Sequence, residues 1–216
     1  MRLSAILVVL MMLIFSPPAR AASDEAKPYK ELTGSPVLAE KDDGRIEVIS
    51  FFWYGCGTCF RIDEAVSRWA DKLPSDVRFI RKHVAFGPPV DVHARIFTTL
   101  KVMGRGHEDD LKVFNVFLAQ RKPVNTLIDL PRLAEALSLD EKKLIETFNS
   151  KEVDQEMAKL DKLMAAYNIE AVPSLVIDGK YVFNVGDTNG PQGYLEQADR
   201  LIQQRRQERL AAAGNK

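Results

Sequence analysis

Two kinds of apolar pattern follow each other in the first part of the chain. Residues 45–54 form a β-branched and aromatic run of the kind that builds a buried strand. Apolar residues then recur at helical spacing from Thr58 until Pro74 ends the pattern. Residues 77–84 alternate Val, Phe and Ile with Arg and Lys, which predicts a second strand with one solvated face. The pattern therefore predicts a strand–helix–strand unit.

The middle of the chain is predicted to be helical almost throughout. Gly87-Pro88-Pro89 interrupts the chain, and residues 90–163 then carry apolar side chains at helical spacing. Ser138-Leu139-Asp140-Glu141 supplies the polar residues that begin a helix. We expect several helices with short connections, which together form a small helical domain with its own core.

Strand patterns return near the end of the chain. Residues 174–177 and 180–185 are β-prone, and the Asp178-Gly179 pair between them is a strong signal for a two-residue hairpin turn. Residues 194–209 predict a final helix, and residues 211–216 predict a frayed tail. Because strands come from both ends of the chain, the predicted fold class is α/β, with one sheet completed after the helical insertion.

The first residues have the pattern of a secretory signal. Met1-Arg2 is a short basic start, residues 3–15 are apolar except for one serine, and Pro17-Pro18 breaks the run. Ala19-Arg20-Ala21 then offers small residues at both positions that specify cleavage. We expect residues 1–21 to be a cleaved signal peptide. The alternative is an uncleaved anchor, but the apolar run is shorter than the roughly 20 residues that span a bilayer.

Composition narrows the class of protein further. Acidic and basic residues balance at 30 each, which gives no reason to expect nucleic acid or an anionic membrane as a partner. The sequence shows no repeat, no low-complexity tract and no later apolar segment of membrane-spanning length. We expect the mature chain to be soluble, and our leading interpretation, set out below, is a monomer.

The two cysteines are the most informative residues. Cys56 and Cys59 enclose only Gly57-Thr58. A disulfide that closes so short a loop removes little chain entropy, so chemistry explains the pair better than structural stabilisation. Structural zinc needs four ligands, and the chain has no second cysteine pair and only three scattered histidines. We therefore expect no metal, and no cofactor beyond a redox-active disulfide.

The position of the pair suggests different roles for its two members. Cys56 lies at the predicted start of a helix, where free backbone N–H groups and the helix dipole stabilise a thiolate. Cys59 lies about one helical turn further on, where it can reach back while the turn shields it. Disulfide exchange needs an attacking thiolate and a second thiol that resolves the mixed disulfide. We assign Cys56 as the nucleophile and Cys59 as the resolving thiol.

Several motifs resemble those of the bacterial DsbA family in the thioredoxin superfamily, and together they extend over nearly the whole mature chain. The matching segments are Lys27-Pro28-Tyr29, residues 52–59 (FWYGCGTC), residues 82–86 (KHVAF), Val172-Pro173 and residues 178–181 (DGKY). The resemblance implies a thioredoxin fold with an inserted helical domain. It places the thioredoxin-like domain at residues 22–86 and 161–216, and the insertion at residues 87–160.

The resemblance also implies function, location and partners. Such proteins are periplasmic thiol:disulfide oxidoreductases that donate their disulfide to newly exported polypeptides through a mixed disulfide. A DsbB-like membrane protein reoxidises them and passes the electrons to quinone. In thioredoxin-like proteins a cis proline faces the cysteines, and the residue before it binds an extended substrate strand. Carried over, these residues are Pro173 and Val172.

Two positions depart from the family pattern. The family commonly has Pro-His between its cysteines, where this chain has Gly57-Thr58, so the dipeptide is expected to alter the redox tuning. The family also commonly has a buried acid where this chain has Ser50. That acid is thought to help move the proton of the second thiol, and a serine cannot ionise to do so. Two interpretations of His83 stay open: a modulator of Cys56, or a strand histidine with structural hydrogen bonds only.

Two alternatives to a strong oxidant follow from these departures. A weaker oxidant would act as a reductase or isomerase, although isomerases of this kind usually carry a separate dimerisation domain that is not visible here. A redox-inactive chaperone or peptide-binding module is the alternative from a different class, and the presence of both cysteines disfavours it.

Overall fold

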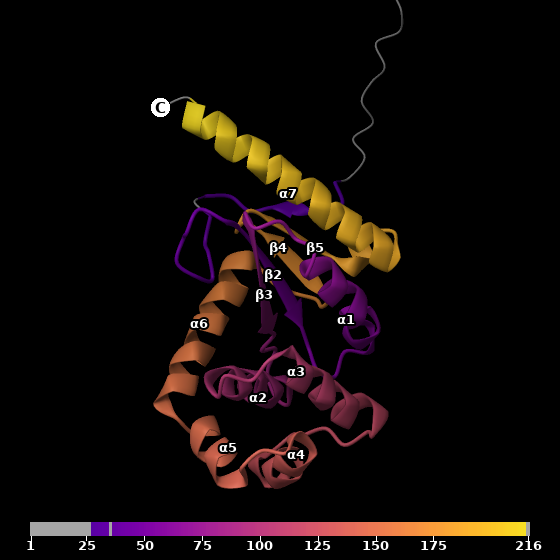
Figure 1. Cartoon of the computed structure of the whole chain (residues 1–216), viewed down its shortest axis with the longest axis vertical. Coiled ribbons are helices and arrows are strands. Elements are labelled where there is room, and N and C mark those ends of the chain that lie inside the picture. The colour runs from indigo at the N-terminus through magenta and orange to yellow at the C-terminus, as the bar shows by residue number, and fades with distance from the viewer. Residues whose placement is uncertain (1–26, 35, 215–216) are drawn as a thin grey trace, which may run out of the picture.

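The computed structural model describes residues 27–34 and 36–214, so the expected signal peptide at residues 1–21 lies outside the described residues. A five-stranded sheet forms the centre, with strand order β1-β5-β4-β2-β3 (Figure 1). Strands β2 and β3 are parallel, whereas the other neighbours are antiparallel. The strands are β1 (Lys30–Glu31), β2 (Ile46–Phe52), β3 (Val77–His83), β4 (Ser174–Ile177) and β5 (Tyr181–Asn184). The mixed sheet from both ends of the chain confirms the predicted fold class.

The predicted hairpin joins β4 and β5. Asp178 and Gly179 both have positive φ, at 54° and 59°, and Ile177 pairs with Tyr181, so the turn spans three residues, Asp178 to Lys180, where the sequence predicts two. A Cβ at position 179 would lie 2.2 Å from the carbonyl oxygen of Val37, so only glycine fits there. The turn therefore fixes the register of the hairpin and lets the N-terminal segment pack close to it.

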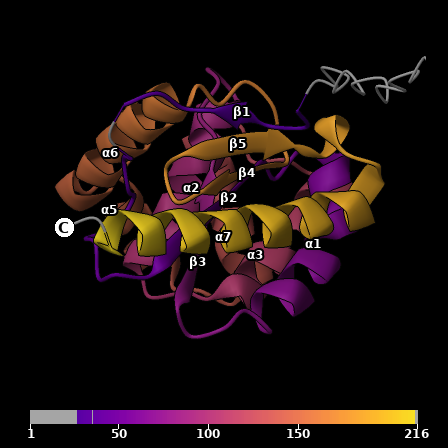
Figure 2. The same cartoon turned by 90° about the horizontal axis from the view of Figure 1, so that it is seen from above.

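Helices cover both faces of the sheet, and the alternation of side chains along β2 explains why. Ile46 and Val48 pack with α1 (Gly57–Ala70) and α7 (Gly190–Gly214), whereas Ile49 and Phe51 pack on the opposite face. That second face is covered by α6 (Lys151–Tyr167). Figure 2 shows α7 lying across one side of the sheet and α6 on the other. Every residue of β2 is buried, as expected for a strand between two helical layers.

The insertion packs at the end of the sheet where β2 and β3 finish (Figure 1). Its elements are α2 (Val90–Val102), α3 (His107–Phe114), a π-helical turn (Asn115–Ala119), a 3-10 turn (Leu127–Asp129), α4 (Leu130–Leu137) and α5 (Glu141–Phe148). The predicted start of α5 is confirmed, because the Asp140 side chain accepts a hydrogen bond from the N–H of Lys143.

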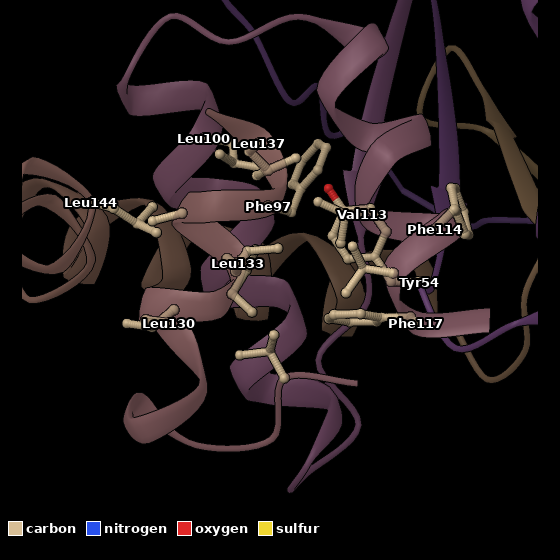
Figure 3. Close-up of a cluster of buried hydrophobic side chains, with 14 of the residues drawn as sticks. Tyr54, Phe97, Leu100, Val113, Phe114, Phe117, Leu130, Leu133, Leu137 and Leu144 are labelled. Carbon is tan, nitrogen blue, oxygen red and sulfur yellow. The ribbon is translucent and has the colours of Figure 1, made fainter. Parts of the chain in front are cut away.

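The core of the helical insertion reaches the loop that carries the cysteines. Figure 3 shows Tyr54 among side chains from α2, α3 and the following turn, including Phe97, Val113 and Phe117. Tyr54 is fully buried, and its ring centroid lies 5.6 Å from that of Phe117. The insertion therefore shares one packed core with the residues that precede Cys56.

The C-terminal helix is longer than the sequence predicts. Helix α7 continues to Gly214, so the expectation of a frayed tail from residue 211 is wrong for residues 211–214. Ala211, Ala212 and Ala213 have the highest helix propensity, which lets the helix continue without packing. None of the helices in the described ranges combines the length and apolar character needed to cross a membrane.

A buried carboxylate fastens α7 to the hairpin at the end of the sheet away from the insertion. Asp178 is fully buried, and its carboxylate accepts hydrogen bonds from Arg205 Nε at 2.8 Å and Arg209 Nε at 2.9 Å. An exposed pair on the same helix, Arg206 with Asp76, has a similar 2.7 Å contact. The two sites differ chiefly in burial, so they separate the effect of a buried charge from that of an exposed one.

Asp178→Asn should lower the free energy of unfolding by about 3 kcal/mol, because it removes a buried charge and leaves the nearly buried Arg205 with Glu208 alone as its counter-charge. Asparagine tolerates the positive φ of the turn, so the backbone itself gives no reason for the loss. Asp76→Asn is the matched control and should cost less than about 1 kcal/mol, as is usual for exposed pairs. Urea unfolding of both variants measures the difference, and equal losses would contradict this account.

Candidate active site

Cys56 occupies the N-cap of α1. Its N–H donates to the carbonyl oxygen of Trp53 at 2.9 Å, which closes a tight turn after β2. Its backbone is extended, and its sulfur accepts a hydrogen bond from the N–H of Cys59 at 3.0 Å. The sulfur therefore faces the free N–H groups and the positive end of the α1 dipole, the surroundings that stabilise a thiolate.

The two cysteines form a disulfide but differ in exposure. Their Cα atoms lie 5.2 Å apart, within the usual range for a bonded pair. Cys59 is only 3% exposed, whereas Cys56 is partly exposed. An incoming thiol can therefore reach the sulfur of Cys56 more easily than that of Cys59.

The Val172-Pro173 segment lies beside the disulfide although it is more than a hundred residues away in the sequence. The peptide bond between the two residues is cis, as the resemblance implied. The carbonyl oxygen of Val172 lies 4.0 Å from the sulfur of Cys56. Pro173 directly precedes β4, the neighbour of β2, so the sheet brings this backbone to the cysteines.

A guanidinium group lies over the dipeptide between the cysteines. Arg61 Nη2 donates to Thr58 Oγ1 at 2.8 Å, and a Cβ at Gly57 would lie 3.4 Å from Arg61 Nη1. The sequence interpretation missed Arg61, although its i,i+3 spacing from Thr58 on a predicted helix was a usable signal. A positive charge therefore lies near the dipeptide where the family commonly has histidine.

His83 is fully buried and uses both ring nitrogens on backbone groups. Its Nε2 accepts the N–H of Tyr54 at 3.1 Å, so Nδ1 carries the proton and donates to the carbonyl oxygen of Val84 at 2.7 Å. Burial lowers the pKa of His83 to about 3, which keeps the ring neutral at physiological pH. The structure places His83 under the loop that leads to Cys56, where it fixes the backbone of Tyr54.

A second buried histidine, which the sequence interpretation did not select, holds Trp53. The indole Nε1 donates to His93 Nδ1 at 2.9 Å, and His93 Nε2 lies 3.2 Å from Asn125 Oδ1. Burial lowers the pKa of His93 from its ordinary value of 6.5. The Trp53 ring lies so close to Gly55 that a Cβ there would be 2.3 Å from a ring carbon. Glycine is therefore required directly before Cys56.

Ser50 lies behind the disulfide, on the wall of a small cavity. The cavity has a volume of about 10 Å³ and is lined by Ser50, Phe52, Cys59, Ile62, Asp63, Val66, Arg81 and Pro173. Two of these residues carry charge: Arg81 Nη1 donates to Asp63 Oδ1 at 2.8 Å. The sequence interpretation noted the missing acid at position 50 but did not find the carboxylate at position 63.

The described residues contain no group of three or more His, Cys, Asp and Glu side chains placed to bind one metal ion. A cavity of about 610 Å³ also exists, but it follows the free edge of β3 between α2 and α6, and neither cysteine lines it. Disulfide exchange with a protein needs an accessible sulfur and a backbone to bind, so we place the candidate site at Cys56.

Comparisons with known proteins agree with this site. The family described as the DSBA-like thioredoxin domain matches residues 47–192. The DsbA of Pseudomonas aeruginosa is 37% identical over 180 residues, which cover 83% of this chain and 84% of that protein. The DsbA of Pseudomonas syringae pv. tomato is 34% identical over 210 residues, or 97% of each chain.

Solved structures give the same result. The crystal structure of Pseudomonas aeruginosa DsbA matches with a TM-score of 0.79 at 36% identity, covering 88% of this chain and 95% of that one. The similarity therefore extends through both the sheet and the helical insertion. By its sequence and by the arrangement of its elements, this chain belongs to the DsbA family of thiol:disulfide oxidoreductases.

Proposed function

We propose that this protein introduces disulfide bonds into newly exported polypeptides in the periplasm, with Cys56 as the attacked sulfur and Cys59 as the buried partner. One observation carries the proposal: the sulfur of Cys56 is partly exposed at the N-cap of α1, while Cys59 is buried behind it. A substrate thiolate that attacks Cys56 forms a mixed disulfide and releases Cys59. A second thiolate of the same substrate then attacks the substrate sulfur of the mixed disulfide. This forms the substrate disulfide and releases Cys56 as a thiolate.

We assign substrate binding to Val172 and Pro173. The Val172 carbonyl oxygen, 4.0 Å from the sulfur of Cys56, is positioned to accept a backbone hydrogen bond from an extended substrate chain. Binding through backbone groups depends little on side chains, which suits an enzyme that acts on many unfolded proteins. Pro173 has no N–H to donate, but its carbonyl oxygen accepts a hydrogen bond from the N–H of Val185 at 3.3 Å, which holds the segment to the sheet.

The remaining assignments follow from family membership. We propose a monomer in which residues 22–86 and 161–216 form the thioredoxin-like domain and residues 87–160 form the insertion. Helix α6 runs through residues 151–167, so one helix connects the two parts. A DsbB-like membrane quinone reductase is the proposed reoxidising partner, because each catalytic cycle leaves the enzyme as a dithiol.

The strength of the oxidant depends on the surroundings of Cys56. The α1 N-terminus and Arg61 favour a thiolate, whereas Thr58 cannot supply the charge of a histidine. The weaker-oxidant alternative, a reductase or isomerase, rests on this substitution. Equilibration with glutathione measures the reduction potential of the Cys56–Cys59 disulfide and so distinguishes an oxidase from a reductase or isomerase. A reduction potential near that of a reductase would contradict the proposed oxidase function.

Cys59→Ala should accumulate mixed disulfides with exported proteins, because Cys56 stays reactive and no second thiol resolves the intermediate. Cys56→Ala should accumulate few, because the remaining thiol is buried. Non-reducing gels of periplasmic extracts measure both variants, with the Cys56→Ala, Cys59→Ala double variant as the background. Stronger trapping by Cys56→Ala would reverse the assigned roles.

Thr58→His should lower the Cys56 pKa and raise the reduction potential by tens of millivolts, because an imidazole adds an N–H donor and, when protonated, a positive charge. One pKa unit is worth about 1.4 kcal/mol, which is about 30 mV in a two-electron couple. A lowered pKa stabilises the reduced protein above the unfolded thiol pKa of about 8.5, and this gain is lost as pH falls through the folded value.

Thiolate absorbance against pH and equilibration with glutathione measure this effect. Arg61→Gln is the opposite change. It removes the positive charge beside Thr58 and should shift the Cys56 pKa upward. An unchanged or raised pKa in Thr58→His would show that the dipeptide does not tune this site and that the N–H groups of α1 dominate.

A further inference from the structure

Two charged side chains and a histidine meet behind Cys59, and none of them takes part in the exchange reaction proposed above. Asp63 of α1 is 4% exposed, and its Oδ1 accepts a hydrogen bond from Arg81 of β3 at 2.8 Å. Its Oδ2 lies 2.9 Å from Nε2 of His107, the first residue of α3. The helical insertion thus places an imidazole against a buried carboxylate of the thioredoxin-like part.

The cluster lies next to the buried cysteine. Cys59 and Asp63 are four residues apart on α1, which puts them on the same face of the helix. Both line the cavity of about 10 Å³. That volume is about the minimum for one water molecule, and the polar groups of Asp63, Arg81 and Ser50 on its walls would bind one. A single water there would border both Cys59 and Asp63.

The exchange reaction creates a charge at this place. When a substrate thiolate attacks Cys56, the bond between the two enzyme sulfurs breaks and Cys59 leaves with its electron pair as a thiolate. Cys59 is 3% exposed, and burial of this kind disfavours the charged form of a thiol. Opening of the disulfide therefore becomes easier if a nearby group donates a proton to Cys59.

His107 is placed to supply that proton. Besides Asp63, its ring faces Asp110 of its own helix, with Nδ1 at 3.6 Å, while Ser67 Oγ lies 3.0 Å from Nε2. Interaction with Asp110 and then with Asp63 raises the pKa of His107 above its ordinary 6.5, against the opposing effects of burial and Arg81. The side chain is 30% exposed, so the ring can exchange protons with solvent.

Further polar and charged groups surround the cluster. Lys101 of α2 pairs with Asp110 at 3.1 Å, and Ser67 accepts a hydrogen bond from Arg81 at 2.7 Å while it donates to the carbonyl oxygen of Asp63. The pKa of Asp63 is lowered overall: burial raises it, but the 2.9 Å contact with His107 and the charge of Arg81 outweigh burial. Asp63 is therefore a carboxylate at neutral pH, 2.9 Å from an imidazole whose pKa is raised.

We propose that Asp63 and His107 form a proton relay for Cys59. When the disulfide opens, a proton passes from His107 through Asp63 and the bridging water to the Cys59 thiolate, and the imidazole regains a proton from solvent. When the disulfide reforms, the proton of Cys59 returns along the same path, and the two electrons leave with the oxidising partner. This inference rests on the proposed function, because it requires Cys59 to be the leaving thiol.

The test measures how fast a peptide with a single cysteine opens the disulfide of the purified oxidised protein at a series of pH values. The ratio of wild-type to variant rate cancels the pH dependence of the peptide thiol. At pH values below the His107 pKa, the wild type should react at least about tenfold faster than Asp63→Asn or His107→Gln. This is a smaller effect than the roughly 10²–10⁴-fold that general acid–base catalysis usually contributes. The ratio should fall towards one as pH rises through the His107 pKa, because the donor is then lost.

Two further variants make the test specific. Asp109→Asn is the matched control. Asp109 is a buried carboxylate of α3, the helix of His107, and it pairs with Arg105 and Lys112 outside the relay. The ratio of wild-type to Asp109→Asn rate should stay near one at every pH. Ser50→Glu places a carboxylate on another wall of the cavity and should restore part of the rate in the Asp63→Asn protein. The His107 pKa is read from the imidazole resonances of the oxidised wild type.

The outcomes separate the relay from the proposed function. Ratios that do not change with pH, or that match those of Asp109→Asn, would overturn the relay while the exchange activity itself stands. A wild-type protein whose disulfide the peptide does not open would overturn the proposed function and the relay with it. If Asp63→Asn does not fold, His107→Gln decides alone, because its side chain lies at the surface.

Discussion

The arrangement of the redox site depends on the buried contacts of Tyr54, two residues before Cys56. Its N–H donates to the neutral ring of His83, and its hydroxyl donates to Asp110 of the insertion at 2.7 Å. The low pKa of His83 keeps Nε2 free to accept at physiological pH. Because both contacts are buried, losing either would leave a polar group unsatisfied, which costs roughly 1–3 kcal/mol. The sheet and the helical insertion are therefore joined at the point where the chain turns into α1, and this fixes Cys56 at the N-cap.

From that position the two sulfurs acquire opposite surroundings. Cys56 faces N–H groups, a nearby guanidinium and the Val172 carbonyl oxygen, and a substrate can reach it. Cys59 faces the inside of the protein, where the Asp63, Arg81 and His107 cluster is the nearby source of charge. The proposed roles of the two sulfurs, one attacked and one leaving, rest on this difference. The insertion contributes directly, because both Asp110 and His107 belong to α3.

Local sequence patterns predict the elements well and the contacts between them poorly. The runs at residues 45–54 and 174–177, the Asp178-Gly179 turn and the cysteine position at a helix start are all present, because each depends on neighbouring residues. The Asp63–His107 pair joins residues from α1 and α3, and no periodicity links them. The charge network of Asp178 holds the C-terminal part of α7, and the sequence interpretation missed it because arginines near a helix end usually face solvent. Ser50 illustrates the same limit. The sequence shows that the family's acid is absent at this position, but only the fold shows that the Asp63 carboxylate lies across the same cavity.

The central claim is that the fold makes the two thiols of the reduced protein chemically unequal. Iodoacetamide alkylation of the reduced, folded protein, with each cysteine followed by mass spectrometry across a pH series, tests it most directly. Cys56 should be modified first, with an apparent pKa well below the unperturbed value of about 8.5, while Cys59 stays unmodified until the protein is unfolded. Equal rates for the two cysteines, or faster modification of Cys59, would contradict the account.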